Sequence, residues 1–168
     1  TLNISTVEDP MEYELGFTNQ VNVHESIGMT FAAALRSLLR QDPDVIMLGE
    51  IRDEETARIA IQASLTGHMV LSTLHPNDAP SSITRIINIG VEAYLISAAV
   101  NAVLAQRLVR RICENCKEPL TNIPEHYKRY LAGYELAPKE LFHGRGCERC
   151  RQTGYKGRVG LYELMELN

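Results

Sequence analysis

A short apolar run that ends in two carboxylates is the feature that most constrains the fold of this chain. Residues 45–48 read VIML, Gly49 and Glu50 follow directly, and Asp53 comes three residues later. Four consecutive apolar residues bounded by polar ones are typical of a strand in a parallel sheet covered on both faces. Because ligands bind beyond the carboxyl ends of such strands, Glu50 stands where a site is expected.

The segments around this run alternate between strand and helix patterns. Strands are predicted at 2–7, 20–24, 45–48 and 68–75, and helices at 31–39, 54–65, 82–89 and 94–112. Thr30 and Asp53 are expected to cap the first two helices. The alternation predicts an α/β fold with a mainly parallel sheet over residues 1–112, and a change of composition predicts a second part at 113–168.

Charge and length exclude two classes of protein. The 168 residues carry a net charge of -4, so there is no general basic field and nucleic acid is not an expected partner. The most apolar stretch, 94–105, is interrupted by Ser97 and Asn101 and is too short to span a bilayer. No signal peptide is visible, and the opening TLNISTVEDP has the pattern of the middle of a domain.

Polar side chains follow three of the predicted strands. They are Glu8 with Asp9, Glu50 with Asp53, and Thr73 with His75. A buried strand that ends in a carboxylate is the Walker B arrangement of nucleoside triphosphatases, where the acid holds Mg²⁺ or orients the attacking water. Spacing alone leaves a plainer alternative open: Asp53 is only a helix cap, Glu50 a solvated strand end, and the histidines packed or surface residues.

Four ordered stretches resemble a known family. They are STVEDPMEY, LRSLLRQDPDVIMLGEIRDEETA, ASLTGHMVLSTLHPNDA and VLAQRLVRRIC. Together they are similar to the secretion ATPase superfamily, in its type II secretion and type IV pilus assembly branch. TVEDP looks like the aspartate box of that family, IMLGEIRD like its Walker B motif, and TGHMVLSTLH like its histidine box. The resemblance implies a RecA-like ATPase domain, present here in part, and a homohexameric ring.

The resemblance also implies roles for individual residues. Glu50 would be the catalytic carboxylate that polarises the lytic water and supports Mg²⁺. Glu8 and Asp9 would lie beside Glu50 and order the water shell of the metal ion. His68 and His75 would contact the γ-phosphate region of ATP.

Four further residues fall within the motifs that carry the resemblance. Arg52 and Asp53 complete the GEIRD signature, and Arg36 and Arg40 belong to the LRSLLRQDPD stretch. All four are assigned by the resemblance to nucleotide binding.

Two departures from the family pattern change what this chain is expected to do. No G-x-x-x-x-G-K-[ST] motif is present, so the phosphate cradle and its lysine are missing. The chain is therefore expected to be a C-terminal fragment that is inactive alone and lacks the arginines of the family's N-terminal domain. Pro76 follows His75 where the family commonly has threonine, and it removes a backbone donor beside the site.

The four cysteines form two C-x-x-C pairs, Cys113 with Cys116 and Cys147 with Cys150. Two such pairs supply the four thiolates of a structural zinc site. A thioredoxin-like redox pair needs only one C-x-x-C at a helix start, and disulfides fit poorly with a chain that has no secretion signal. Structural zinc is therefore favoured, and the tetracysteine part resembles that of assembly rather than retraction ATPases.

The cysteine part is locally basic. Its cationic residues are Lys117, Arg145, Arg149, Arg151, Lys156 and Arg158. They form either a solvated surface or a docking surface for an acidic partner or a membrane. The family implies a cytoplasmic protein, peripheral to the inner membrane, that works with an inner-membrane platform protein.

Two other functions compete with that of an assembly ATPase. In one, the chain is a non-catalytic module whose zinc part binds the platform protein and whose α/β part is a scaffold. In the other it belongs to a nucleic-acid motor of the same superfamily, which the acidic net charge and the cysteines disfavour.

Overall fold

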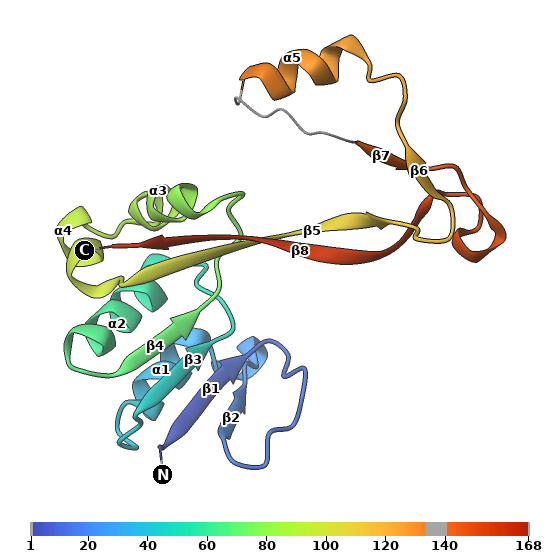
Figure 1. Ribbon diagram of the computed structural model, residues 1–168. Helices are drawn as coiled ribbons and strands as arrows, with labels where there is room; N and C mark the ends of the chain where they lie inside the picture. Colours follow the sequence, from blue (N-terminus) through green and yellow to red (C-terminus); the bar gives the residue numbers. More distant parts are fainter. Residues whose placement is uncertain (1, 134–140, 168) are drawn as a thin grey trace. The chain divides into compact units, whose positions relative to one another are not determined.

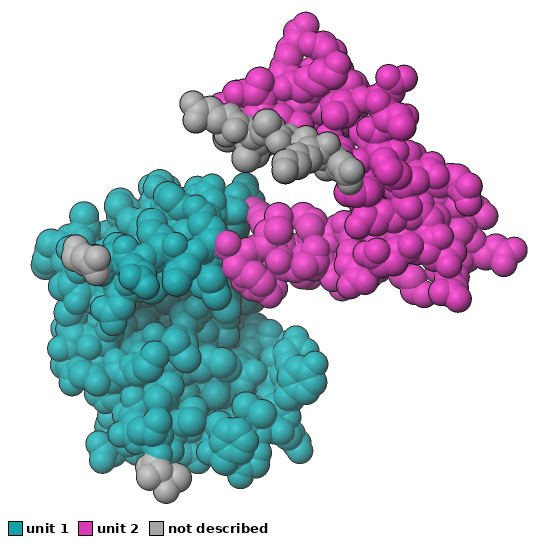
Figure 2. Space-filling model, in the orientation of Figure 1, with its two compact units in different colours: residues 1–105, 163–168 teal, residues 106–162 magenta. Residues whose placement is uncertain are grey.

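The computed structural model describes residues 2–133 and 141–167 (Figure 1). The chain divides into two compact units (Figure 2). The sheet unit comprises residues 1–105 and 163–168, and the cysteine unit comprises residues 106–162. A domain boundary near Ile112, expected from the composition, stays a prediction. No helix in the described ranges combines the length and apolar character needed to cross a bilayer.

The sheet unit is built on four parallel strands. These are β1 (Ile4–Glu8), β2 (Asn19–Asn22), β3 (Val45–Leu48) and β4 (Met69–Ser72), in the order β2-β1-β3-β4. Its helical elements are η1 (Glu25–Ile27), α1 (Phe31–Leu38), α2 (Glu54–Leu65), α3 (Ala79–Ile89) and α4 (Ala93–Ala99). The prediction of an α/β fold with a parallel sheet is confirmed, and so are Thr30 and Asp53 as N-caps of α1 and α2.

The main core lies between the sheet and helices α1 and α2. Val7 pairs in register with Leu48, and both side chains are fully buried against Leu35 of α1. The alternate residues of the strands point to the other face of the sheet. There Met69 and Leu71 of β4 are 59% and 48% exposed. Thr6 of β1, in register with Met47 and Leu71, is 2% exposed, so among the described residues this face is uncovered mainly at its β4 edge.

A second core cluster packs α3 and α4 against α2. Ile86 of α3 and Ile96 of α4 are buried there with Ile61 of α2. Van der Waals contact among these aliphatic side chains fixes where α3 lies, and α3 borders the site described below.

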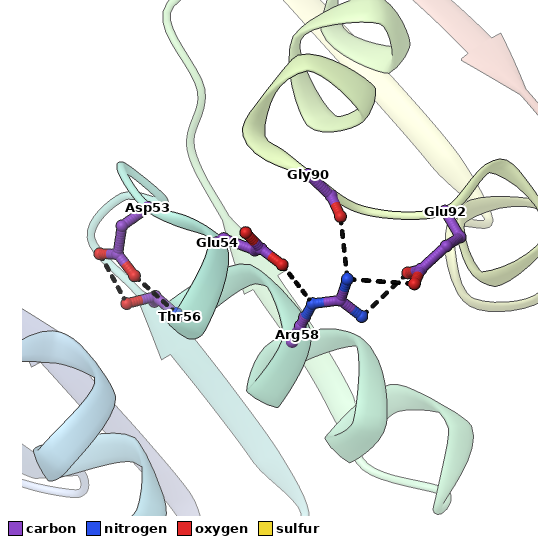
Figure 3. Close-up of polar contacts among 6 residues, drawn as sticks. All are labelled: Asp53, Glu54, Thr56, Arg58, Gly90 and Glu92. Carbon is purple, nitrogen blue, oxygen red and sulfur yellow. Dashed lines mark hydrogen bonds and ion pairs between the residues drawn. The ribbon is translucent and has the colours of Figure 1, made fainter.

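Arg58 of α2 connects that helix to the turn between α3 and α4 (Figure 3). Its guanidinium donates to Glu54 at 2.7 Å, to both carboxylate oxygens of Glu92 at 2.9 and 3.0 Å, and to the carbonyl of Gly90 at 3.0 Å. The bonds to Glu92 and Glu54 raise the pKa of Arg58 further above its already high value. Gly90 has φ +115°, and a Cβ there would lie 2.8 Å from the Glu54 carboxylate, so glycine alone fits this turn.

The helix predicted at 94–112 is wrong beyond residue 99. Helix α4 ends at Val100, whose backbone is extended, and β5 (Ala102–Ile112) follows as a strand. It pairs with β8 (Tyr155–Glu166), because Asn101 accepts from the Leu167 N–H and Cys113 donates to the Gly154 carbonyl. These bonds show that β5 and β8 run antiparallel. A pairing partner more than forty residues away decided this conformation, and local periodicity does not contain that information.

The cysteine unit has little apolar core of its own. Besides parts of β5 and β8 it contains β6 (Lys117–Pro119), α5 (Glu125–Gly133), β7 (Phe142–Gly144) and η2 (Glu148–Cys150). Strands β6 and β7 pair antiparallel. Among its described residues, the buried hydrophobic side chains are those of Cys113, Cys116 and Cys150. The sulfur cluster is therefore the centre around which this unit is organised.

The N-cap of α2 gives a test of what Asp53 does for stability. Its Oδ1 accepts from the Thr56 N–H at 2.8 Å and its Oδ2 from the Thr56 hydroxyl at 3.0 Å (Figure 3). We expect Asp53→Ala to lower the free energy of unfolding by about 1 kcal/mol, because the first turn loses its acceptor. Asp53→Asn keeps an acceptor and should cost much less. Urea unfolding followed by circular dichroism compares the two, and equal losses would contradict the capping role.

Candidate functional site

The candidate active site lies at the carboxyl ends of β1, β3 and β4. The register pairs Val7 with Leu48, and Leu48 with Ser72, so the residues that follow these strands emerge at one edge of the sheet. Glu8 ends β1, Glu50 comes two residues after β3, and His75 comes three residues after β4. Parallel pairing thus brings together polar residues that are far apart in the sequence.

Gly49 lets Glu50 leave β3 close to β1. Its N–H donates to the Val7 carbonyl at 2.8 Å, and its own carbonyl accepts from the Thr73 hydroxyl after β4. A Cβ at this position would lie 3.3 Å from the Val7 carbonyl oxygen, which is tighter than most side chains allow. The bonds on both sides of Gly49 hold the loop that carries Glu50 between the two neighbouring strands.

Glu50 is the central carboxylate of this edge. Its side chain is 19% exposed, and it accepts from Arg52 through both oxygens, Nε to Oε2 and Nη2 to Oε1, each at 2.8 Å. The Nε2 of His75 lies 3.5 Å from Oε2. The hydrogen bond from Arg52, strengthened by the charges of Arg52 and His75, holds the pKa of Glu50 below its ordinary value despite partial burial. Glu50 is therefore ionised at neutral pH.

The carboxylates of β1 flank this pair in different ways. Asp9 lies beside Arg52, with 3.6 Å between Oδ2 and Nη1. Glu8 instead accepts from the Thr6 hydroxyl at 2.7 Å and from the Gln20 amide at 3.1 Å. Arg52 thus bridges Glu50 and Asp9, and the hydrogen bonds of Glu8 fix its carboxylate on the neighbouring strand.

A cavity of about 310 Å³ opens beside Glu50. Its polar lining comes from Glu50, Arg52 and His75, which were expected at the site, and from Arg85 of α3, which was not. Leu74 and Pro76 contribute apolar walls. The sequence carries no local signal for Arg85, because its position depends on how α3 packs back over the end of β4.

Four other residues predicted for the site lie elsewhere. His68 precedes β4, at the opposite end of that strand from His75, and its Nδ1 lies 3.0 Å from the Ala63 carbonyl near the end of α2. Asp53 is occupied with the cap of α2. Arg36 pairs with Glu55 of α2, and Arg40 is solvent-exposed after α1. The structure does not bring these four to the Glu50 cluster, and their roles in nucleotide chemistry stay predictions.

The four cysteine sulfurs form a second candidate site in the cysteine unit. All lie within 4.8 Å of one another, with 3.9 Å for Cys113–Cys147 and Cys116–Cys150 and 3.7 Å for Cys147–Cys150. Four thiolates at 2.3 Å from one metal ion would be separated by about 3.8 Å, whereas a disulfide needs about 2 Å. The four cysteines are free in this structure, and their spacing fits a tetrahedral metal ion.

The surroundings of the sulfurs favour the thiolate form for Cys147 and Cys150 and oppose it for Cys116. A hydrogen bond from the Asn115 amide at 3.4 Å lowers the pKa of Cys147 to about 6. Burial acts against ionisation of Cys150, but N–H donors of Cys147 and Gly154 at 3.2 and 3.3 Å bring its pKa below the ordinary value. Burial raises the pKa of Cys116 to about 12. A bound cation would offset the cost of ionising that thiol.

The whole chain matches one protein family. The model of the family described as "Type II/IV secretion system protein" covers residues 1–168. Among curated proteins, the chain is 55% identical over 164 residues to the type IV pilus assembly ATPase PilB of Thermus thermophilus, covering 97% of this chain and 18% of that protein. It is 54% identical over 166 residues to type II secretion system protein E of Pseudomonas aeruginosa, covering 98% of this chain and 33% of that protein.

Solved structures agree with the sequence matches. The pilus retraction motor PilT with bound ADP superposes with a TM-score of 0.68 at 31% identity, over 100% of this chain and 39% of that one. The ATPase DotB of Legionella pneumophila shares the fold, with a TM-score of 0.61 at 22% identity, over 99% and 37% of the two chains. The chain thus spans a third or less of the two curated relatives named above.

The pairing of Glu50 with Arg52 predicts a titration effect. The pKa of Glu50 lies below 4.5, so the pair stabilises the fold above about pH 4.5 and loses this contribution as the pH falls through the lowered pKa. We expect Arg52→Gln to raise the pKa of Glu50, and Arg52→Lys, which keeps a positive charge, to raise it less. Carboxyl ¹³C chemical shifts followed against pH measure this directly. Indistinguishable titrations for the parent and Arg52→Gln would refute the pairing in solution.

Proposed function

Since this chain belongs to the type II/IV secretion system protein family, we propose that its full-length protein is an ATPase. In this proposal it works in a type II secretion or type IV pilus assembly machine. ATP hydrolysis at the cytoplasmic face of the inner membrane drives a homohexameric ring that acts on a membrane platform protein. The single observation that supports this best is the convergence of Glu50, Arg52 and His75 beside one cavity at the carboxyl edge of the sheet, with Asp9 paired to Arg52.

Glu50 has the position and ionisation that phosphoryl transfer requires. It is mostly buried, ionised at neutral pH and next to a cavity. Hydrolysis needs a base or dipole that orients water for in-line attack on the γ-phosphorus, and a carboxylate at this strand end supplies it. The bidentate bond from Arg52 places one donor on each oxygen of Glu50. The remaining lone pairs of the carboxylate are available to accept a hydrogen bond from water.

The acidic side chains suit Mg²⁺. Glu50, Glu8 and Asp9 offer hard oxygen donors at adjacent strand ends, which is the ligand type this ion selects. When bound, Mg²⁺ would neutralise charge on the phosphates. In the proposal Glu50 and Asp9 hold the ion through its water molecules, and Glu8, fixed by Thr6 and Gln20, orients part of that water shell. His75, 80% exposed and 3.5 Å from Glu50, is the side chain free to turn toward the γ-phosphate.

For the cysteine unit we propose a structural zinc ion held by Cys113, Cys116, Cys147 and Cys150. Zinc is the ion that four thiolates in a closed tetrahedral set most commonly bind. The unit has a thin apolar core, so the ion would take over the role that buried side chains have elsewhere. The basic residues around it are proposed to contact an acidic partner or the membrane surface.

Substitution of Glu50 in the full-length protein tests the catalytic proposal. Glu50→Gln keeps the size of the side chain but removes its charge, so we expect turnover to fall by about 100-fold or more while nucleotide binding remains. Glu125→Gln, on the exposed face of α5, is the matched control and should hydrolyse ATP like the parent. If Glu50→Gln retained the parental rate, the chain would be better described as a non-catalytic interaction module.

Metal analysis tests the zinc proposal on this chain alone. We expect one zinc per chain and, after chelation, loss of amide dispersion for residues near the four cysteines while signals of the parallel sheet persist. Cys150→Ser should lose most of the metal. Asn115→Ala removes a donor to sulfur but leaves all four ligands, so its zinc content should match the parent. Metal-free reduced protein, or a Cys113–Cys116 disulfide in its place, would exclude the proposal.

A further inference from the structure

Gln20 of β2 links the candidate active site to the β1–β2 loop, residues 10–18. Its Nε2 donates to Glu8 Oε1 at 3.1 Å and to the Tyr13 carbonyl at 2.9 Å, and its Oε1 accepts from the Leu15 N–H at 2.6 Å. Both N–H donors and the carbonyl oxygen of this one amide are therefore in use. A flipped amide would turn its oxygen toward two acceptors, so the three partners fix its orientation.

The strand pairing places Gln20 where it can reach Glu8. Strands β1 and β2 pair in parallel, with Thr6 opposite Gln20 and Val7 opposite Val21. Because side chains alternate along a strand, Thr6, Glu8 and Gln20 share one face of the sheet, while Val7 packs in the core on the other. The buried Thr6 hydroxyl donates to Glu8 Oε1 as well, at 2.7 Å. Donors from two strands thus hold the Glu8 carboxylate.

Both of these hydrogen bonds fall on the same oxygen of Glu8. Within residues 2–133 and 141–167, no hydrogen bond or ion pair is made to its Oε2. Two donors on Oε1 set the rotation of the carboxylate, so Oε2 has a defined position and can accept from metal-bound water. A Cβ on Gly49 would lie 3.4 Å from the Cα of Glu8, so the backbone of Glu8 adjoins the strand end that carries Glu50.

We propose that Gln20 is a positioning residue that couples the β1–β2 loop to the orientation of Glu8, and so sets how tightly the site holds Mg²⁺. The inference rests on the function proposed above and deepens it. If the loop shifts, the amide cannot keep its bonds to Tyr13 and Leu15 without moving relative to Glu8. A displaced loop therefore reorients the carboxylate, and by linkage the observed loop position is the one that favours metal binding.

The dependence of ATP hydrolysis on Mg²⁺ concentration in the full-length protein gives the first test. We expect Gln20→Leu to raise the Mg²⁺ concentration at half-maximal rate by about tenfold, because a hydrogen bond to a charged group is lost. The rate at saturating Mg²⁺ should change less than about twofold. Asn19→Ala, at the start of β2, is the matched control, since its amide bonds Asn3 and not the site. Parental Mg²⁺ dependence in an active Gln20→Leu enzyme would overturn the proposal and leave the ATPase function standing.

A double-mutant cycle shows whether Gln20 acts through Glu8. In the Glu8→Ala background, Gln20→Leu should have no further effect on the Mg²⁺ requirement, because the acceptor is already gone. Thr6→Val removes the other donor to Glu8 Oε1 and should raise the requirement in the parent background. An equal increase from Gln20→Leu with and without Glu8 would show that Gln20 acts only on the stability of the fold, which contradicts the proposal.

Hydrogen exchange in the 168-residue chain tests the coupling without ATP. We expect Glu8→Ala to speed exchange of the Leu15 N–H by about fivefold, because Gln20 loses one of its three partners, and to have no such effect once Gln20→Leu is present. This result would support the coupling even if the full-length protein proved unable to hydrolyse ATP. Equal exchange of the Leu15 N–H in the parent and in Glu8→Ala would overturn it. The far-ultraviolet circular dichroism of each variant verifies that it has folded.

Discussion

The in-register parallel pairing of β1, β3 and β4 is the constraint on which the candidate active site depends. Each strand contributes only four or five residues, so none of them could fix a side chain by itself. Backbone hydrogen bonds between strands and the buried contacts of Val7, Ile46 and Leu48 hold the three ends level. A register slip of one residue in β1 would move Val7 to the opposite face of the sheet, out of the core. The same slip in β3 would move Leu48 out of the core and displace Glu50 from the site.

Different interactions hold the candidate site residues in place in the two units. The sheet unit is held by aliphatic packing, and its site groups are placed by hydrogen bonds to neighbouring strands, as at Gly49 and Thr73. In the cysteine unit, the sulfur of Cys147 accepts a hydrogen bond from the Asn115 amide, and that of Cys150 accepts from two backbone N–H groups. The buried apolar side chains that hold the first unit have no described counterpart in the second besides the cysteines themselves.

Features set by neighbouring residues could be predicted from the sequence. The VIML strand, the caps Thr30 and Asp53 and the two C-x-x-C pairs depend on local propensity and spacing, and the structure has each of them. Features set by distant contacts could not. Residues 102–112 have apolar spacing that also fits a helix, and pairing with β8 made them a strand. Arg85 reaches the cavity through packing of α3 that no motif encodes. The position of His68 is different, because the predicted strand at 68–75 already placed it at the opposite end from His75.

The antiparallel pairing of β5 with β8 has a consequence for how the cysteine unit arose. The chain enters it along β5 and leaves along β8, and the Cys113 N–H donates to the Gly154 carbonyl, so the two ends of the segment 113–154 lie side by side. Topologically, residues 113–154 are an elaborated tip of a β-hairpin. One genetic insertion or deletion at that tip could add or remove the entire four-cysteine part, and a short turn would reconnect the strands. Such a change would leave the register of β1, β3 and β4 as it is.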